Sequence, residues 1–123
     1  MRWNPTDPMF SRHVTRETDF FGVHLPAGSV LHLCLGAANH DPARWDRADE
    51  YDITRAPKPS LAFGNGPHVC LGMHVARAEM NVGITALLDR LPNLRLDPDY
   101  SPPYPIGHDL RVPDEIRVKF DIG

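Results

Sequence analysis

The chain has 123 residues, of which 41% are hydrophobic, and a formal net charge of −3 at pH 7. This length suits one domain with a moderate core, and the negative charge argues against a nucleic-acid partner. The two cysteines, Cys34 and Cys70, cannot build a disulfide framework, and the sequence shows no signal peptide and no membrane-length apolar segment. We therefore expect a cytoplasmic location.

The first regular stretch runs from about residue 14 to 35 and alternates apolar and polar residues around two turn signals, Phe21-Gly22 and Pro26-Ala27-Gly28. This pattern predicts two short strands that form a hairpin, with V-L-H-L-C-L (30–35) as the more buried strand. Cys34 lies in that apolar run and is expected to be an inert core residue.

Two long irregular stretches, 39–63 and 97–113, are dense in turn-forming residues. Between them, a helix is predicted from about Leu71 to Leu91, where Pro92 stops it. Its polar residues form one narrow stripe, which predicts a helix surrounded by protein on most sides. A short terminal strand is predicted over 115–120. Because long structureless connections are uncommon in a small domain, the chain is expected to be part of a larger fold.

Residues 63–72 read F-G-N-G-P-H-V-C-L-G and lead directly into the predicted helix. Cys70 therefore stands after a glycine-rich loop and at a helix start, where backbone N–H groups and the helix dipole favour a thiolate. A lone thiolate of this kind is a suitable axial ligand for haem iron in oxygen chemistry.

A rival interpretation of the same segment is a small zinc-binding domain. His68, Cys70 and His74 offer three zinc ligands, with Cys70 and His74 one helical turn apart. Structural zinc sites usually contain paired C-x-x-C or H-x-x-x-H units, which this segment lacks. Haem ligation is therefore the favoured hypothesis.

Four motifs in a fixed order extend the loop into a family pattern. They are a hairpin segment from Arg12 to Gly28, A-N-H-D-P at 38–42 with Y-D-I-T-R at 51–55, the loop at 63–72, and A-R at 76–77. In this order they closely resemble the C-terminal portion of the cytochrome P-450 family, the haem-thiolate monooxygenases, in its soluble bacterial form.

The resemblance implies that Cys70 is the metal-binding residue, the axial thiolate of haem b. It assigns Phe63 to packing against the porphyrin, and His68 and Arg12 to the haem propionates. The cofactor-binding residues expected on this basis are Arg12, Phe63, Gly64, His68, Cys70, Gly72 and Ala76. No catalytic residue beyond the haem ligand is expected in this chain.

The fold class implied is mainly α with small β, as in the C-terminal part of the cytochrome P-450 fold. Its expected parts are a short hairpin, an irregular meander, the haem-thiolate loop, a long proximal helix and a terminal strand. Residues 1–123 would be the haem-binding portion of a domain that is incomplete at its N-terminus. Arg2 resembles the arginine of the family's E-x-x-R motif, which joins a buried ionic network that includes the meander arginine, here Arg55.

The function implied for the parent enzyme is insertion of one atom of O2 into a small apolar organic substrate. Electrons would come from NAD(P)H through a reductase and a ferredoxin-type donor. Met9, Phe10 and Ile106 are expected either in the core or beside the substrate, and Arg77 on a helix surface or at a docking face for the donor. The isolated chain is expected to be an inactive fragment, and the alternative is a non-catalytic haem-binding or interaction module.

Overall fold

The computed structural model describes residues 1–122 and divides them into two compact units. The first unit comprises residues 1–64 together with 108–111. The second comprises residues 65–107 and the chain from Val112 onward. Helix and strand occupy similar shares of the described residues, so the chain by itself does not display the expected mainly α character.

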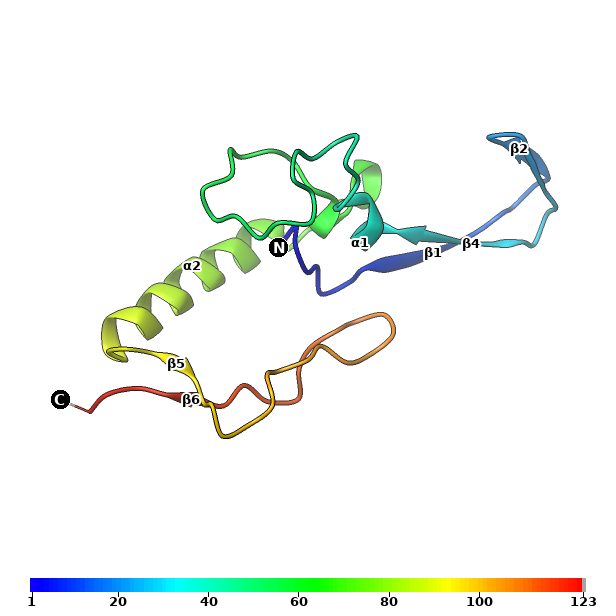
Figure 1. Cartoon of the computed structure of the whole chain (residues 1–123). Coiled ribbons are helices and arrows are strands. Elements are labelled where there is room, and N and C mark those ends of the chain that lie inside the picture. The colour runs from blue at the N-terminus through cyan, green and yellow to red at the C-terminus, as the bar shows by residue number, and fades with distance from the viewer. Residues whose placement is uncertain (123) are drawn as a thin grey trace. The chain divides into compact units, whose positions relative to one another are not determined.

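The first unit begins with a two-stranded antiparallel ribbon. Strand β1 (Met9–His13) pairs with β4 (Val30–Cys34), and Met9 lies opposite Cys34. Between them in sequence, β2 (Thr18–Phe20) and β3 (Val23–Leu25) form a hairpin. The ribbon continues into this hairpin, as Figure 1 shows.

The hairpin reverses at Phe21 and Gly22, which have φ angles of 49° and 78°. Positive φ at both central residues is typical of a tight hairpin turn, so the predicted turn at this position is confirmed. The predicted partner of the 30–35 strand was wrong, because β4 pairs with β1 and not with a strand inside residues 14–29. The segment Met9–His13 lacks clear alternation, and its pairing partner lies about 20 residues away.

The prediction that Cys34 is a core residue is also wrong, since its side chain is exposed. The ribbon has only two strands, and no residue of β4 is fully buried. Met9 and Phe10 are half-buried and not core. The core of this unit lies further along, where helix α1 (Leu35–Ala38) meets the irregular segment 39–60. The buried residues there and at the ribbon's end are Val14, Leu35, Asn39, Trp45 and Ala48.

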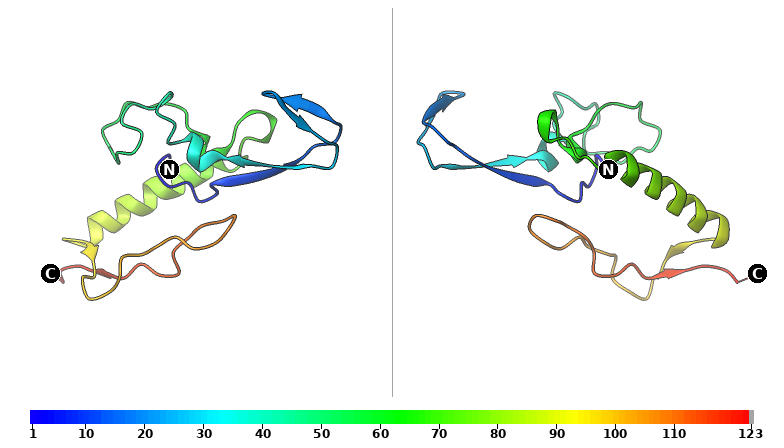
Figure 2. Two further views of the ribbon diagram at one scale, coloured as in Figure 1. Left: turned by 45° about the vertical axis from the view of Figure 1, so that its right-hand side comes forward. Right: turned by 180° about the vertical axis from the view of Figure 1, so that it is seen from behind.

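The second unit contains the long helix α2 (Met73–Arg90), which confirms the predicted helix to within two residues at each end. Two short strands follow it, β5 (Arg95–Leu96) and β6 (Val118–Lys119), and these pair antiparallel. Strand β5 was not predicted, and the predicted terminal strand over 115–120 is reduced to two residues. Figure 2 shows the chain leaving α2 directly into β5.

No residue of α2 is buried, which contrasts with the expectation of a helix surrounded by protein. Its apolar side chains are largely exposed, for example Val82 at 68% and Leu88 at 63%. An apolar helix in this state lacks the packing that normally stabilises helices in proteins.

Candidate functional site

The segment before α2 contains a short turn followed by a cysteine. Residues Gly66–His68 form a 3₁₀ turn, and the amide of Val69 donates to the carbonyl of Gly66 over 3.1 Å. Gly66 has a φ of 69°, a conformation that glycine adopts at no steric cost. His68 lies in this turn with an exposed side chain.

Cys70 follows the turn and precedes the first residue of α2, Met73, by three positions. Its thiol is exposed, and its carbonyl accepts a hydrogen bond from the amide of Met73 over 3.3 Å. Gly72 is the N-cap residue of the helix, and its carbonyl accepts from the amide of Ala76 over 2.9 Å. Because no side chain caps this end and no acidic residue lies in the first turn, the positive end of the helix dipole is not offset locally.

Gly72 is close to the cysteine sulfur. A β-carbon built at position 72 would lie 4.0 Å from Sγ, which is an ordinary van der Waals contact. The thiol therefore leaves room for a small side chain at position 72. Contact with the thiol does not require glycine here, and the role expected for Gly72 from the sequence is contact with the cofactor.

The residues expected around the cofactor are divided between the two units. His68, Cys70, Gly72 and Ala76 belong to the second unit, while Arg12, Phe63 and Gly64 belong to the first. Phe63 ends a 3₁₀ turn (Leu61–Phe63) and is half-buried. Gly64 caps that turn with φ 74° and ψ −166°, a backbone region essentially limited to glycine.

Arg12 lies in the middle of β1 with an exposed side chain. Its guanidinium donates to the carbonyl of Ser11 over 2.8 Å and stands 5.9 Å from the ring centroid of Phe10. An exposed arginine on a strand is free of burial costs and retains donors for an external carboxylate.

The alternative zinc site is not formed. Within residues 1–122, no group of three or more His, Cys, Asp or Glu side chains could hold a metal ion, so His68, Cys70 and His74 do not converge. Cys70 is therefore a free, exposed cysteine that is not part of a multi-ligand group among the described residues.

Four further histidines lie on the surface, while His40 is half-buried. His24 contacts Asp19 over 3.2 Å, His32 contacts the Ser11 hydroxyl over 3.1 Å, and His108 contacts Asp109 over 2.9 Å. His13 is an exposed residue at the end of β1. Ile106, expected beside the substrate or in the core, is 49% exposed and forms a β-bridge with Val112.

Sequence reasoning missed a cationic cluster around Trp45, which is only 4% exposed. Three cationic groups stand over its indole ring, at 5.2 Å for Arg2, 5.6 Å for Arg44 and 5.3 Å for Lys58. Arg2 donates hydrogen bonds to backbone carbonyls, including that of Asn39 at 2.6 Å, and it shares the carbonyl of Glu50 with Arg55. The available signal in the sequence was the run A-R-W-D-R at 43–47, which places arginines on both sides of Trp45.

Several buried donors near this cluster lack an acceptor among the described residues. They are Asn39 Nδ2, Trp45 Nε1 and Arg55 Nε. A pocket of about 410 Å³ lies in the same unit and is lined in part by Arg2, Trp45 and Arg55. Buried donors usually have partners, so this pocket suits an additional acceptor group.

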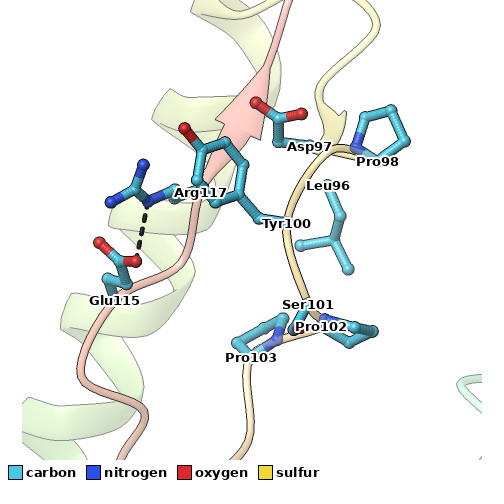
Figure 3. A pocket seen from close by; sticks show the side chains of 9 residues that line it. All are labelled: Leu96, Asp97, Pro98, Tyr100, Ser101, Pro102, Pro103, Glu115 and Arg117. Atoms are coloured by element: carbon cyan, nitrogen blue, oxygen red, sulfur yellow. Dashed lines mark hydrogen bonds and ion pairs between the residues drawn. The ribbon is translucent and has the colours of Figure 1, made fainter.

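A second, smaller pocket of about 250 Å³ lies beside β5 and β6 (Figure 3). The Arg117 guanidinium stacks 4.0 Å from the ring centroid of Tyr100 and forms an ion pair of 2.8 Å with Glu115. Arg117 thus contacts both Tyr100 and Glu115 within the pocket lining. None of the predicted site residues lines this pocket.

Within residues 1–122, no helix is both long and apolar enough to span a membrane.

Comparison with known proteins gives a consistent result. The family model described as "Cytochrome P450" matches residues 1–119. The biotin biosynthesis cytochrome P450 of Bacillus subtilis is 39% identical over 121 residues, which cover 98% of this chain and 30% of that protein. Cytochrome P450 105C1 of a Streptomyces species is 45% identical over 102 residues, which cover 83% of this chain and 26% of that protein.

Solved structures agree with these relatives. The structure of P450BioI in complex with hexadec-9Z-enoic acid ligated acyl carrier protein has a TM-score of 0.89 and 38% identity, over 98% of this chain and 31% of that one. CYP109E1 of Bacillus megaterium in complex with testosterone has a TM-score of 0.90 and 26% identity, over 98% of this chain and 34% of that one. The chain thus spans about a quarter to a third of the length of its relatives. It belongs to the cytochrome P450 family.

Proposed function

We propose that this chain is the C-terminal, haem-binding portion of a cytochrome P450 monooxygenase, with Cys70 as the thiolate ligand of haem b. The observation that carries the proposal is the exposed thiol of Cys70 beside the uncapped start of an 18-residue helix. Haem bound through a thiolate supplies the iron chemistry that inserts one atom of O2 into a substrate while the other becomes water.

The other residues of this chain would hold and orient the cofactor. Arg12 offers an exposed guanidinium and His68 an exposed imidazole, and both side chains are suited to hydrogen-bond the two haem propionates. Phe63 would pack on the porphyrin. Gly64 and Gly72 would allow close approach of the backbone, and Ala76 would leave space for the macrocycle on the first turns of α2.

The substrate would be a small apolar organic molecule. This class is supported by the relatives crystallised with testosterone and with a hexadec-9Z-enoic acid ligated to acyl carrier protein, both of which present apolar carbon skeletons. Electrons would reach the haem from a ferredoxin-type donor and an NAD(P)H-dependent reductase in the cytoplasm. Arg77 would belong to the docking face for that donor.

The activity would belong to a longer domain, of which residues 1–123 are one portion. Two observations support this. The apolar side chains of α2 are exposed, and the buried donors of Asn39, Trp45 and Arg55 lack acceptors among the described residues. A carboxylate from the E-x-x-R motif, to which Arg2 is assigned, would supply such an acceptor in the pocket beside Trp45.

Reconstitution of the chain with haem tests the ligand assignment. We expect the wild-type chain to give a thiolate-type spectrum with carbon monoxide, and Cys70→Ser to lose it. Cys34→Ser is the matched control, because Cys34 is the other exposed free cysteine and lies in β4. Equal spectra for Cys70→Ser and wild type would contradict the proposal. A thiolate-type spectrum without oxygenation of any substrate in a lengthened chain would favour a non-catalytic haem-binding module.

A further inference from the structure

Asn39 is the most deeply buried polar side chain of the described residues, with 1% exposure. It follows α1 directly, and its amide donates to the carbonyl of Leu35 over 3.0 Å. Its own carbonyl accepts the 2.6 Å hydrogen bond from Arg2. Both backbone polar groups of Asn39, its amide and its carbonyl, are therefore hydrogen-bonded, which fixes the backbone from which its side chain extends.

The side chain of Asn39 makes one long-range bond. Its Oδ1 accepts from the amide of Leu61 over 2.8 Å, across 22 residues of sequence. Leu61 is the first residue of the 3₁₀ turn that ends at Phe63, and first-turn amides have no acceptor within their own turn. The side-chain Nδ2 has no hydrogen-bond partner among residues 1–122, so within them only the acceptor oxygen of the side chain is used.

The turn held by Asn39 is the entry to the cysteine loop. Gly64 closes the turn by donating from its amide to the Leu61 carbonyl over 3.0 Å, and it adopts the glycine-only conformation described above. The loop 65–72 continues from it without a break. A shift of the Leu61 amide would therefore change the position and direction in which the chain enters that loop.

We infer that Asn39 is a positioning residue for the cysteine loop, acting through the bond from the Leu61 amide to its Oδ1. The inference rests on the proposed function only where it concerns the haem. The other part, that Asn39 Oδ1 anchors the turn before Gly64, does not depend on whether haem is bound.

The unused Nδ2 atom makes the inference sharply testable with two variants. Asn39→Asp keeps the acceptor oxygen and removes only a donor that has no partner among the described residues. The Arg2 guanidinium, which binds the backbone carbonyl of Asn39, is the cation that would oppose the new charge. Asn39→Leu keeps the number and branching of the side-chain heavy atoms and removes the acceptor, which leaves the Leu61 amide unpaired. Loss of such a bond costs about 1.4 kcal/mol, equivalent to about tenfold in an equilibrium.

The first measurement is hydrogen–deuterium exchange of the Leu61 and Gly64 amides in the full chain without haem. We expect about tenfold faster exchange in Asn39→Leu and rates near wild type in Asn39→Asp. The inference would be overturned if these amides exchanged equally fast in Asn39→Leu and wild type. It would also be overturned if both substitutions raised the exchange rates by the same factor.

The second measurement uses the haem-reconstituted chain and its carbon monoxide spectrum. We expect Asn39→Leu to lower the thiolate-type fraction and Asn39→Asp to preserve it. If wild-type chain forms no thiolate-type complex, the proposed function fails, while the exchange result still decides whether Asn39 anchors the turn.

A third variant guards against general misfolding of Asn39→Leu. Leu61→Pro removes the donor from the other side of the same bond, and Ser60 already has the extended backbone (φ −109°, ψ 166°) that a following proline requires. We expect Leu61→Pro to speed exchange at Gly64 about as much as Asn39→Leu, and the double variant to add nothing further. Fully additive effects would contradict a shared bond.

Discussion

Arg2 and Arg55 donate hydrogen bonds to the same carbonyl oxygen, that of Glu50, each over 3.2 Å. The remaining carbonyl acceptors are those of Asn39 and Ala48 for Arg2, and of Asp46 and Arg47 for Arg55. A guanidinium group presents five donors in a fixed plane, so each arginine can bind several carbonyls at once. The pair therefore gives order to a segment that contains no regular secondary structure.

The first prediction is that Arg2→Ala loosens this irregular segment. Removing three charge-assisted hydrogen bonds from a partly buried site should cost about 2 kcal/mol. The change would appear as faster amide exchange over residues 46–50. Arg16→Ala, at an exposed arginine of the same unit, should leave exchange there within about twofold of wild type. Equal effects of the two substitutions would contradict the role assigned to Arg2.

The successes and failures of sequence reasoning follow from the range of the interactions. The helix Met73–Arg90 and the turn at Phe21-Gly22 depend on local signals, namely a stopping proline and a glycine suited to positive φ, and both were predicted. The β1–β4 pairing joins residues 9–13 to 30–34, so no local pattern marks it. An apolar run also predicted burial of Cys34, but a strand is buried only where another layer covers it.

The candidate site shows the same division. The cysteine loop is contiguous, so its motif places Cys70, His68 and Gly72 in order along the chain. The bonds of Arg2 and of Asn39 Oδ1 go to backbone groups far away in the sequence. Every residue has a backbone carbonyl, and all but proline have a backbone amide. The sequence therefore does not mark which of these groups a distant side chain will bind. This is why the bonds of Arg2 to backbone carbonyls were not predicted.

A second prediction concerns acid. Lys119 donates to Asp97 over 2.8 Å and joins it across the β5–β6 pair, and this bond, with the amide of Asp99, lowers the pKa of Asp97. The folded pKa thus lies below the unfolded value of about 4, so the stabilisation is fully present above pH 4 and is lost as the pH falls through the folded pKa. NMR contacts between Leu96 and Val118 should persist at neutral pH and disappear in strong acid.

Asp97→Asn isolates this effect. The variant should weaken the β5–β6 pair at neutral pH and reduce its acid sensitivity. Some acid dependence should remain, because hydrogen bonds from Asn93 and then Arg95 likewise lower the pKa of Asp121. Asp114→Asn, at an exposed position outside both strands, is the control. Unchanged acid sensitivity in Asp97→Asn would show that the ion pair with Lys119 is not responsible.

A third prediction concerns the hairpin tip. Phe21 is 93% exposed and has a φ of 49°, a conformation unfavourable for a bulky side chain and well suited to asparagine. Phe21→Asn should therefore slow amide exchange in β2 and β3 about threefold, since relief of strain of this kind is worth about 1 kcal/mol and the lost ring contact offsets part of it. Phe20→Ala removes the same ring contact, of 4.7 Å between centroids, without relieving the turn. It should speed exchange, and faster exchange in Phe21→Asn would refute the strain argument.

The last prediction concerns α2. Most helical stability in proteins comes from packing of an apolar face, and α2 contains Gly83 and several β-branched residues of low helix propensity. Since no residue of α2 is buried, its amides should exchange much faster than the Leu61 amide that Asn39 holds, and heating should give no sharp cooperative transition for the helix. An apolar dye should bind the chain, and Val82→Glu together with Leu88→Lys should reduce that binding by removing two exposed apolar side chains. If the α2 amides are as protected as the Leu61 amide and the chain unfolds in one sharp transition, α2 is covered by packing, and the argument that further residues must complete the domain loses its main support.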